Sequence, residues 1–162
     1  MNEHASVQRV KKAAETAGLL IDIVYFKTPA KTAAAAADLV GCTPAQIANS
    51  LIFEGKETGE LLLLLTSGGH RVDLDHAAFQ IGQGLTRADP DRVRKETGFV
   101  IGGVAPFGHL TLLRTYIDEA LFAFYRVWAA GGIAETVFAI SPDDLESATG
   151  ATRFQAASSQ PA

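Results

Sequence analysis

Residues 102–109, with the sequence GGVAPFGH, are the segment whose residue types and spacing are best suited to chemistry. Gly102, Gly103 and Gly108 carry no side chain, and Pro106 stiffens the backbone between them. Such a loop can bring bare N–H groups close to a ligand, and exposed backbone donors hold carboxylates, phosphates and the oxyanions of acyl transfer. The same spacing is also consistent with a long hairpin connection whose glycines serve turns.

Three histidines and Asp118 are the other polar residues that a site could use. His109 follows the last loop glycine, where it can contact a ligand or cap the loop. Asp118 ends the predicted strand after the loop, where it can orient groups of a site or act as a helix N-cap. His70 and His76 are expected on the solvated surface, because they lie in a predicted turn and on a polar-faced helix.

The single cysteine, Cys42, follows a predicted helix end and has no histidine close in sequence. We therefore interpret it as a packed small residue rather than a nucleophile. It cannot form an internal disulfide, and the four scattered histidines provide no zinc-site spacing. The sequence predicts neither a metal site nor a cofactor.

Length and composition limit the classes of protein further. The chain has 162 residues, of which 48% are hydrophobic and 20% charged, so it can bury a sizeable core. A net charge of −4 argues against a general nucleic-acid coating role. Residues 87–95 contain four basic residues with acids interleaved, which is typical of a solvated helix face. The basic residues also leave open a local contact with a nucleic-acid backbone.

No segment of the sequence predicts a membrane protein. The apolar run 61–65 is far shorter than the roughly 20 residues of a membrane helix, and the N-terminus has no apolar signal core. We therefore expect a cytoplasmic protein. Without a repeat, linker or composition break, we expect one domain over residues 1–154 and a flexible C-terminal tail over residues 155–162.

Hydrophobic spacing and capping residues predict the elements that must position these residues. Helices are expected over residues 6–17, 33–40, 74–81 and 90–98, with a short one after Thr43 and a last one from Pro142. Strands are expected over residues 19–26, 50–53, 60–66, 99–101, 110–117, 125–129 and 136–140. The segments 50–53 and 60–66 are predicted to form a hairpin, the second strand being buried on both faces. This order indicates an α+β fold with a mixed, curved sheet.

Several stretches of this chain, in the same order, resemble the YbaK and prolyl-tRNA-synthetase-associated domain family. The resemblance extends over residues 6–150, and its most specific part is the glycine-proline loop that follows Thr97 and Gly98. The matching stretches are TPA at 28–30, QIANSLIF at 46–53, ADP at 88–90, TGFVIGGVAPFGH at 97–109, YID at 116–118 and AAGG at 129–132.

The resemblance implies a barrel-like sheet flanked by helices and an activity on the ester that joins an amino acid to tRNA. Family members remove mischarged amino acids, often from proline-specific tRNA, either in trans or within a synthetase, so aminoacyl-tRNA and an aminoacyl-tRNA synthetase are the implied partners. The candidate catalytic residues are Asn49, Gly102 and Gly103. The candidate substrate-binding residues are Thr28, Lys31, Ser50, Pro106, Gly108, His109 and Asp118.

The chain departs from the family pattern at Asn49. Deacylating members have a lysine followed by a small hydroxyl residue there, whereas this chain has Asn49 and Ser50. Asparagine donates two neutral N–H groups but has no charge, and the loss of a charged donor can cost a few kcal/mol of transition-state stabilisation. Lys27 or Lys31, beside the turn at Thr28, could supply a cation instead.

Two functions from different classes follow from the resemblance. The first is an aminoacyl-tRNA deacylase that hydrolyses the ester of a small mischarged amino acid by water attack, since no protein nucleophile is evident. The second is a non-catalytic homologue that binds tRNA or a synthetase and lost turnover when Asn49 replaced the lysine. In the first function, the N–H groups of Gly102 and Gly103 are expected to contact the ester or its ribose.

Overall fold

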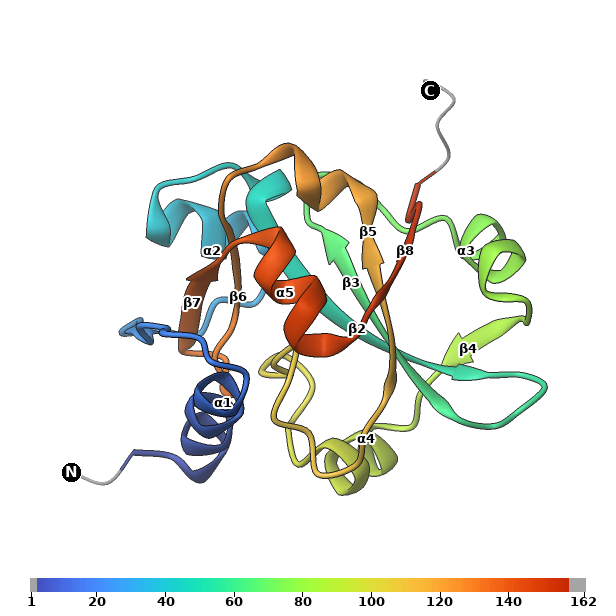
Figure 1. The fold of residues 1–162 in the computed structure, drawn as a ribbon, viewed down its shortest axis with the longest axis horizontal. Coiled ribbons are helices and arrows are strands. Elements are labelled where there is room, and N and C mark those ends of the chain that lie inside the picture. Colours follow the sequence, from blue (N-terminus) through green and yellow to red (C-terminus); the bar gives the residue numbers. More distant parts are fainter. Residues whose placement is uncertain (1–2, 158–162) are drawn as a thin grey trace.

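The computed structural model describes residues 3–157 of the chain as a sheet surrounded by helices (Figure 1). The helices are α1 (Ala5–Thr16), α2 (Ala33–Val40), η1 (Pro44–Gln46), α3 (Leu74–Ile81), α4 (Pro90–Thr97), η2 (Glu119–Ala123) and α5 (Pro142–Thr149). The strands are β1 (Val24–Tyr25), β2 (Ile47–Gly55), β3 (Leu61–Ser67), β4 (Leu85–Arg87), β5 (Arg114–Asp118), β6 (Val127–Ala130), β7 (Thr136–Ile140) and β8 (Thr152–Phe154). None of these helices is long and apolar enough to cross a membrane.

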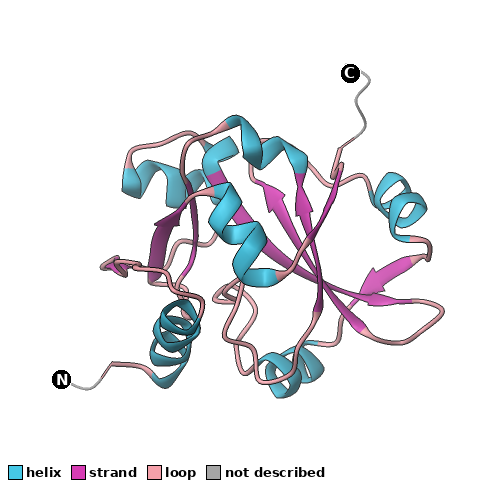
Figure 2. Ribbon diagram, in the orientation of Figure 1, coloured by secondary structure: helices cyan, strands magenta, loops and turns pink. Residues whose placement is uncertain are grey.

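The described strands form one eight-stranded sheet in the order β1-β7-β6-β2-β3-β5-β8, and β4 pairs with β2 outside this path. The β2–β3, β6–β7, β1–β7 and β2–β4 pairs are antiparallel, whereas β2–β6, β3–β5 and β5–β8 are parallel. The predicted α+β fold with a mixed sheet flanked by helices is therefore confirmed (Figure 2). The predicted hairpin is also confirmed, with Ala48 opposite Ser67 and Glu54 opposite Leu61.

Strand β3 is buried along its whole length, as its uninterrupted leucines predict. Successive side chains of a strand point to opposite faces of the sheet. Leu61, Leu63 and Leu65 join the main core, to which α1, α4 and α5 contribute Val10, Val93 and Leu145. Leu62 and Leu64 pack on the other face with Ala77 of α3. Helices therefore cover both faces, and β2 lies beside this buried strand.

The segment between α4 and β5 contains no strand at 99–101, so that prediction is wrong. Phe99 is fully buried in the main core, and the Gly103 N–H donates to the Val100 carbonyl at 2.9 Å, which closes a turn. The predicted strand 110–117 begins only at Arg114. Residues 110 and 111 instead donate their N–H groups to carbonyls at the end of α4, at 3.1 and 2.8 Å.

The predicted strand 19–26 is reduced to Val24 and Tyr25, because β7 pairs with only these two residues. Leu19, Ile21 and Ile23 pack against the main core without a strand partner. The short strands β4 and β8 were not predicted, since three residues carry little periodicity.

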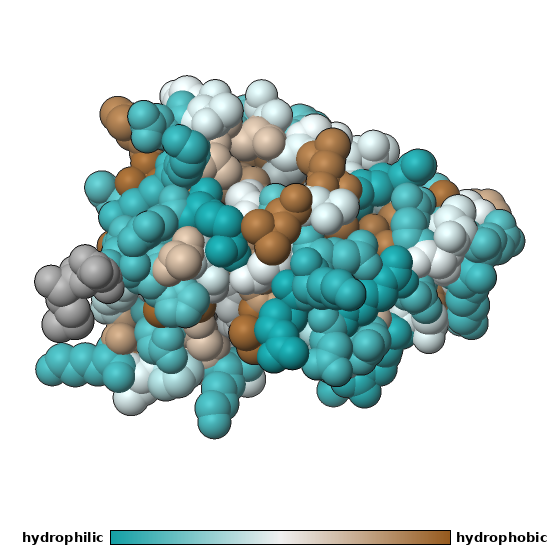
Figure 3. Space-filling view, turned by 90° about the horizontal axis from the view of Figure 1, so that it is seen from below, coloured by the Kyte–Doolittle hydropathy of each residue, from teal (hydrophilic) through white to brown (hydrophobic). Residues whose placement is uncertain are grey.

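The prediction of a flexible tail from residue 155 is wrong for its first residues, whereas residues 158–162 lie outside the described part. Ala156 is fully buried, and its carbonyl accepts the Asp73 N–H at 2.8 Å. Elsewhere on the surface, large apolar side chains are scattered among polar ones, as on the face shown in Figure 3.

Candidate functional site

Strand β2 has an incompletely paired edge, and this edge creates the candidate site. On one side β3 pairs with β2 from Ala48 to Glu54. On the other side β6 pairs only with Ile47 and Ala48, and β4 only with residues 53–55. Residues 49–52 therefore face a gap between β6 and β4, where no described strand covers their outer edge.

Two adjoining cavities of about 280 and 520 Å³ lie along this gap. The smaller lies between α2, β2 and β6, and the larger extends toward β4 and the start of α4. They share the lining residues Ser50, Leu51, Ile101, Gly102 and Val104. We call this combined depression the β2 groove.

The smaller cavity has walls of small apolar side chains. Alanines from α2 and its preceding turn, from β2 and from β6 line it, together with the indole of Trp128. Trp128 lies opposite Ile47 in the parallel register of β6 and β2. At about 280 Å³ this end of the groove lies at the lower limit of small-molecule sites, which span roughly 300–1,000 Å³. Its small apolar walls therefore suit an aliphatic group.

Three candidate residues, Lys31, Asn49 and Ser50, bring polar side chains to the smaller cavity, which Thr32 and Thr136 also line. Asn49 and Ser50 point to opposite faces of β2, yet both reach the cavity because it opens along the strand edge. The Ser50 hydroxyl is buried and has no hydrogen-bond partner among the described residues. Lys31 is the only described charged residue that lines this cavity. A buried hydroxyl without a partner is rare in folded proteins, so this atom is available to a bound group.

The loop glycines differ in their access to the groove. Gly102 lines both cavities, has a φ of +100° and has open space where a Cβ would stand. Its N–H makes no hydrogen bond among the described residues. Gly103 is buried, its N–H is used by the Val100 turn, and a Cβ there would lie 2.7 Å from the Ile133 Cα. Of these two glycines, only Gly102 therefore presents a free backbone donor at the groove.

The remaining loop candidates lie elsewhere. Pro106, Gly108 and His109 line a separate cavity of about 660 Å³ beside α1. The His109 Nε2 lies 2.7 Å from the Ala105 carbonyl oxygen, so this nitrogen carries the hydrogen and the ring closes the loop. Thr28 is exposed and lines neither this cavity nor the groove.

Asp118 is buried away from the groove and acts as a cap, one of its two predicted roles. Its carboxylate accepts the N–H groups of Ser67 and Ala120, both at 3.0 Å, and contacts His70 at 2.7 Å. The expectation of a solvated His70 is therefore wrong. His76 is also only partly exposed, with its Nε2 3.2 Å from the Gln155 Oε1. Sequence spacing missed both contacts because each joins segments more than 40 residues apart.

Cys42 does not line the β2 groove, and the described residues form no metal site there. The Cys42 side chain packs against the small cluster of α2 and β2, and burial raises the pKa of its thiol, which disfavours the nucleophilic thiolate. This agrees with its interpretation as a packed residue. In residues 3–157 no three His, Cys, Asp or Glu side chains gather where they could hold a metal ion.

Comparisons with known proteins match this fold and the residues that line the β2 groove. The family model of the aminoacyl-tRNA editing domain matches residues 27–148. The uncharacterized protein YwhH of Bacillus subtilis is 31% identical over 124 residues, which cover 76% of this chain and 78% of YwhH. The chain therefore belongs to the aminoacyl-tRNA editing domain family, which confirms the resemblance.

Two solved structures share the fold over nearly the whole chain. One is described as a candidate trans-editing enzyme for prolyl tRNA synthetase, with a TM-score of 0.88 and 41% identity over 95% of this chain and 98% of its own. The other, hypothetical protein APE2540, has a TM-score of 0.82 and 25% identity over 91% of this chain and 97% of its own.

Proposed function

We propose that this protein is a deacylase that acts in trans and hydrolyses the ester between a small mischarged amino acid and the terminal ribose of tRNA. The observation that carries this proposal is the β2 groove, where Lys31, Asn49, Ser50 and Gly102 meet within the matched family region. The similarity to a candidate trans-editing enzyme for prolyl tRNA synthetase favours proline-specific tRNA as the nucleic-acid substrate and that synthetase as a partner.

The smaller cavity is where we place the amino acid of the substrate. Its alanine walls and Trp128 suit a short apolar side chain. Selection by size works in an editing site, because that site only has to admit the wrong amino acids that the synthetic site of a synthetase cannot reject. The ribose and the following nucleotides then extend into the larger cavity, toward β4 and α4.

In the proposed reaction, a water oxygen attacks the ester carbonyl carbon, the ester C–O bond breaks, and the ribose oxygen receives a proton. The products are the free amino acid and the uncharged tRNA. The Gly102 N–H and the Asn49 amide can donate to the developing oxyanion, and the Lys31 cation adds a favourable potential. The Ser50 hydroxyl can hold the amino group or the ribose.

Water is a better nucleophile here than Ser50. No described histidine or carboxylate lines the smaller cavity to take a proton from the serine hydroxyl. The vicinal ribose hydroxyl or the amino group of the substrate can assist the attacking water instead. The protein then contributes mainly position and electrostatic stabilisation.

A panel of mischarged tRNAs tests this function, with loss of the ester measured against buffer. We expect hydrolysis of at least one small amino acid, fastest on proline-specific tRNA. No rate above buffer for any pair would contradict the proposed hydrolysis. The panel also identifies the amino acid and the tRNA.

Asn49 favours one second candidate, a homologue that binds tRNA or a synthetase without turnover. The smaller cavity has a neutral amide at the position of the family lysine. The change Asn49→Lys separates the two functions. An active enzyme changes only in rate or specificity, whereas a binding protein gains activity from none.

Binding itself can be followed in both cases. Trp128 is the only tryptophan of the chain and lines the groove, so its fluorescence reports occupancy by a nonhydrolysable aminoacyl-adenosine analogue. Unchanged fluorescence at millimolar analogue, together with no binding of tRNA or synthetase, would contradict both candidate functions.

A further inference from the structure

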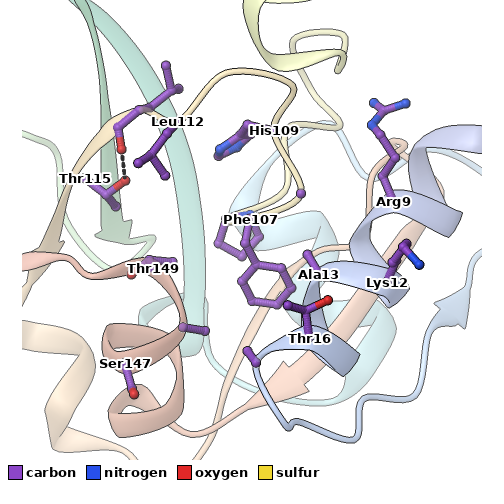
Figure 4. A pocket seen from close by; sticks show the side chains of 15 residues that line it. Arg9, Lys12, Ala13, Thr16, Phe107, His109, Leu112, Thr115, Ser147 and Thr149 are labelled. Carbon is purple, nitrogen blue, oxygen red and sulfur yellow. Dashed lines mark hydrogen bonds between the residues drawn. The ribbon is translucent and has the colours of Figure 1, made fainter.

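A third cavity of the described residues lies outside the β2 groove. Its volume of about 660 Å³ falls well within the roughly 300–1,000 Å³ of small-molecule sites. Figure 4 shows α1 on one side, the loop residues Phe107 and His109 at the centre, and the end of α5 opposite. We call it the α1–α5 cavity. The proposed deacylation uses none of its residues.

The charge of this cavity has one sign. Arg9 and Lys12 line it from α1, and no acidic residue is among its described lining residues. Neither cation forms an ion pair within residues 3–157, whereas the neighbouring Lys11 pairs with Glu3 at 2.9 Å. Two cations without an acidic partner beside one cavity create a local positive potential that favours an anion.

The arginine is held in place by the protein. Its Nη2 donates to the Gly98 carbonyl at 2.6 Å, and its guanidinium carbon lies 4.9 Å from the centre of the Phe99 ring. Lys12 is exposed one turn further along α1 and is free to approach a ligand. The protein therefore fixes one cation, whereas the other makes no ion pair within residues 3–157.

The opposite walls suit an uncharged, partly apolar body. Phe107 and Leu113 are almost fully buried and line the cavity, while hydroxyl groups come from Thr16 at the end of α1 and from Ser147 and Thr149 of α5 (Figure 4). Because His109 Nε2–H donates to the Ala105 carbonyl, the Nδ1 of the neutral ring is an acceptor. Burial lowers the pKa of His109, which keeps this ring neutral.

We propose that the α1–α5 cavity is a second ligand site, which binds a small molecule that joins a phosphate group to a flat body with hydroxyl groups. The phosphate lies near Arg9 and Lys12, and the flat body lies against Phe107 and Leu113. A nucleoside monophosphate has this combination, and a doubly charged phosphate matches two cations better than a single carboxylate does.

The test uses 5′-AMP as the probe, with adenosine and inorganic phosphate as the two halves. Calorimetry on the full chain is expected to show AMP binding at least about tenfold more tightly than either half, since each half loses one set of contacts. Amide NMR shifts are expected in residues 106–109 and along α1. Trp128 fluorescence stays unchanged, because this residue lines the groove and not the α1–α5 cavity.

Two lysine variants provide a matched pair. Lys12→Gln is expected to weaken AMP binding about tenfold, the effect of one charged contact, and to leave adenosine binding unchanged. Lys11→Gln, next to it on α1 but outside the cavity, is the control and keeps the wild-type affinity. Equal AMP affinity in the Lys12→Gln protein and the wild type would overturn the proposal. No AMP binding at millimolar concentration, or AMP binding that changes Trp128 fluorescence instead, would overturn it as well.

Discussion

The His70 imidazole and the Asp118 carboxylate lie 2.7 Å apart, and this pair joins the segment after β3 to the junction of β5 and η2. Asp118 is only 2% exposed and also accepts two backbone N–H groups, those of Ser67 and Ala120. The carboxylate therefore holds three separate donors from two parts of the chain.

This arrangement predicts unequal effects for the two partners. Asp118→Ala leaves the buried Ser67 N–H without an acceptor and removes the cap of η2, so we expect a loss of about 3 kcal/mol in the free energy of unfolding. His70→Ala is expected to cost less than about 1 kcal/mol, because its ring is partly exposed and Asp118 keeps its backbone donors. Urea unfolding measures both; a larger loss for His70→Ala would contradict this order.

Lys31 and Lys27 are the two cations beside the turn at Thr28, but only Lys31 lines the groove. Lys31→Gln is therefore expected to lower kcat/KM for the mischarged tRNA about tenfold, as the loss of one charged contact would. Lys27→Gln is the matched control, with a change of less than about twofold expected. Equal losses in both variants would indicate a general effect of charge on tRNA association rather than a role in the groove.

The two adjacent glycines of the loop are predicted to differ in what their substitution disturbs. A Cβ at Gly103 meets the backbone of Ile133, so Gly103→Ala is expected to cost about 2 kcal/mol, or roughly 4–8 °C in Tm for a domain of this size. Gly102→Ala has open space but a positive φ, at a cost of about 1 kcal/mol.

The expected losses of activity have the opposite order to the losses of stability. Gly102→Ala is expected to lower kcat at least about tenfold, because the backbone donor at the groove is displaced. Gly103→Ala is expected to retain more activity than Gly102→Ala at a temperature where both are folded. Deacylation assays paired with calorimetric melting distinguish these outcomes, and full activity of Gly102→Ala would show that its N–H does not contact the ester.

His109 predicts a pH dependence of stability. Burial lowers its pKa in the folded state, with a further lowering by Arg9 and an opposing effect of the Ala105 hydrogen bond. As the pH falls through about 6.5, the unfolded chain gains a proton that the folded chain does not, so the free energy of unfolding decreases.

The change His109→Gln tests this dependence. Glutamine keeps an N–H donor for Ala105 but cannot titrate, so the variant is expected to lose less stability than the wild type between about pH 7 and pH 5. Urea unfolding at both pH values measures the difference, and the other histidines cancel in the comparison. The same pH dependence in both proteins would show that His109 is protonated equally in the folded and unfolded states.

Local patterns predicted the elements whose signals lie within a few residues. Asp89 and Pro90 mark the start of α4, Ser141 and Pro142 mark that of α5, and the leucines of β3 indicate a strand buried on both faces. Short strands such as β4 and β8 escaped prediction because their existence depends on partners distant in sequence rather than on their own residues.

The sequence alone determined which chemical groups are available: a glycine-proline loop, and a neutral asparagine at position 49. Only the tertiary structure decided which of these groups lie in the β2 groove and which lie beside α1. Strand pairing leaves β2 open at residues 49–52, so Asn49, Ser50, Lys31 and Gly102 meet there. The second half of the loop faces α1 instead, because its buried residues anchor it in the core. Such long-range packing is not encoded in the spacing of residues along the chain.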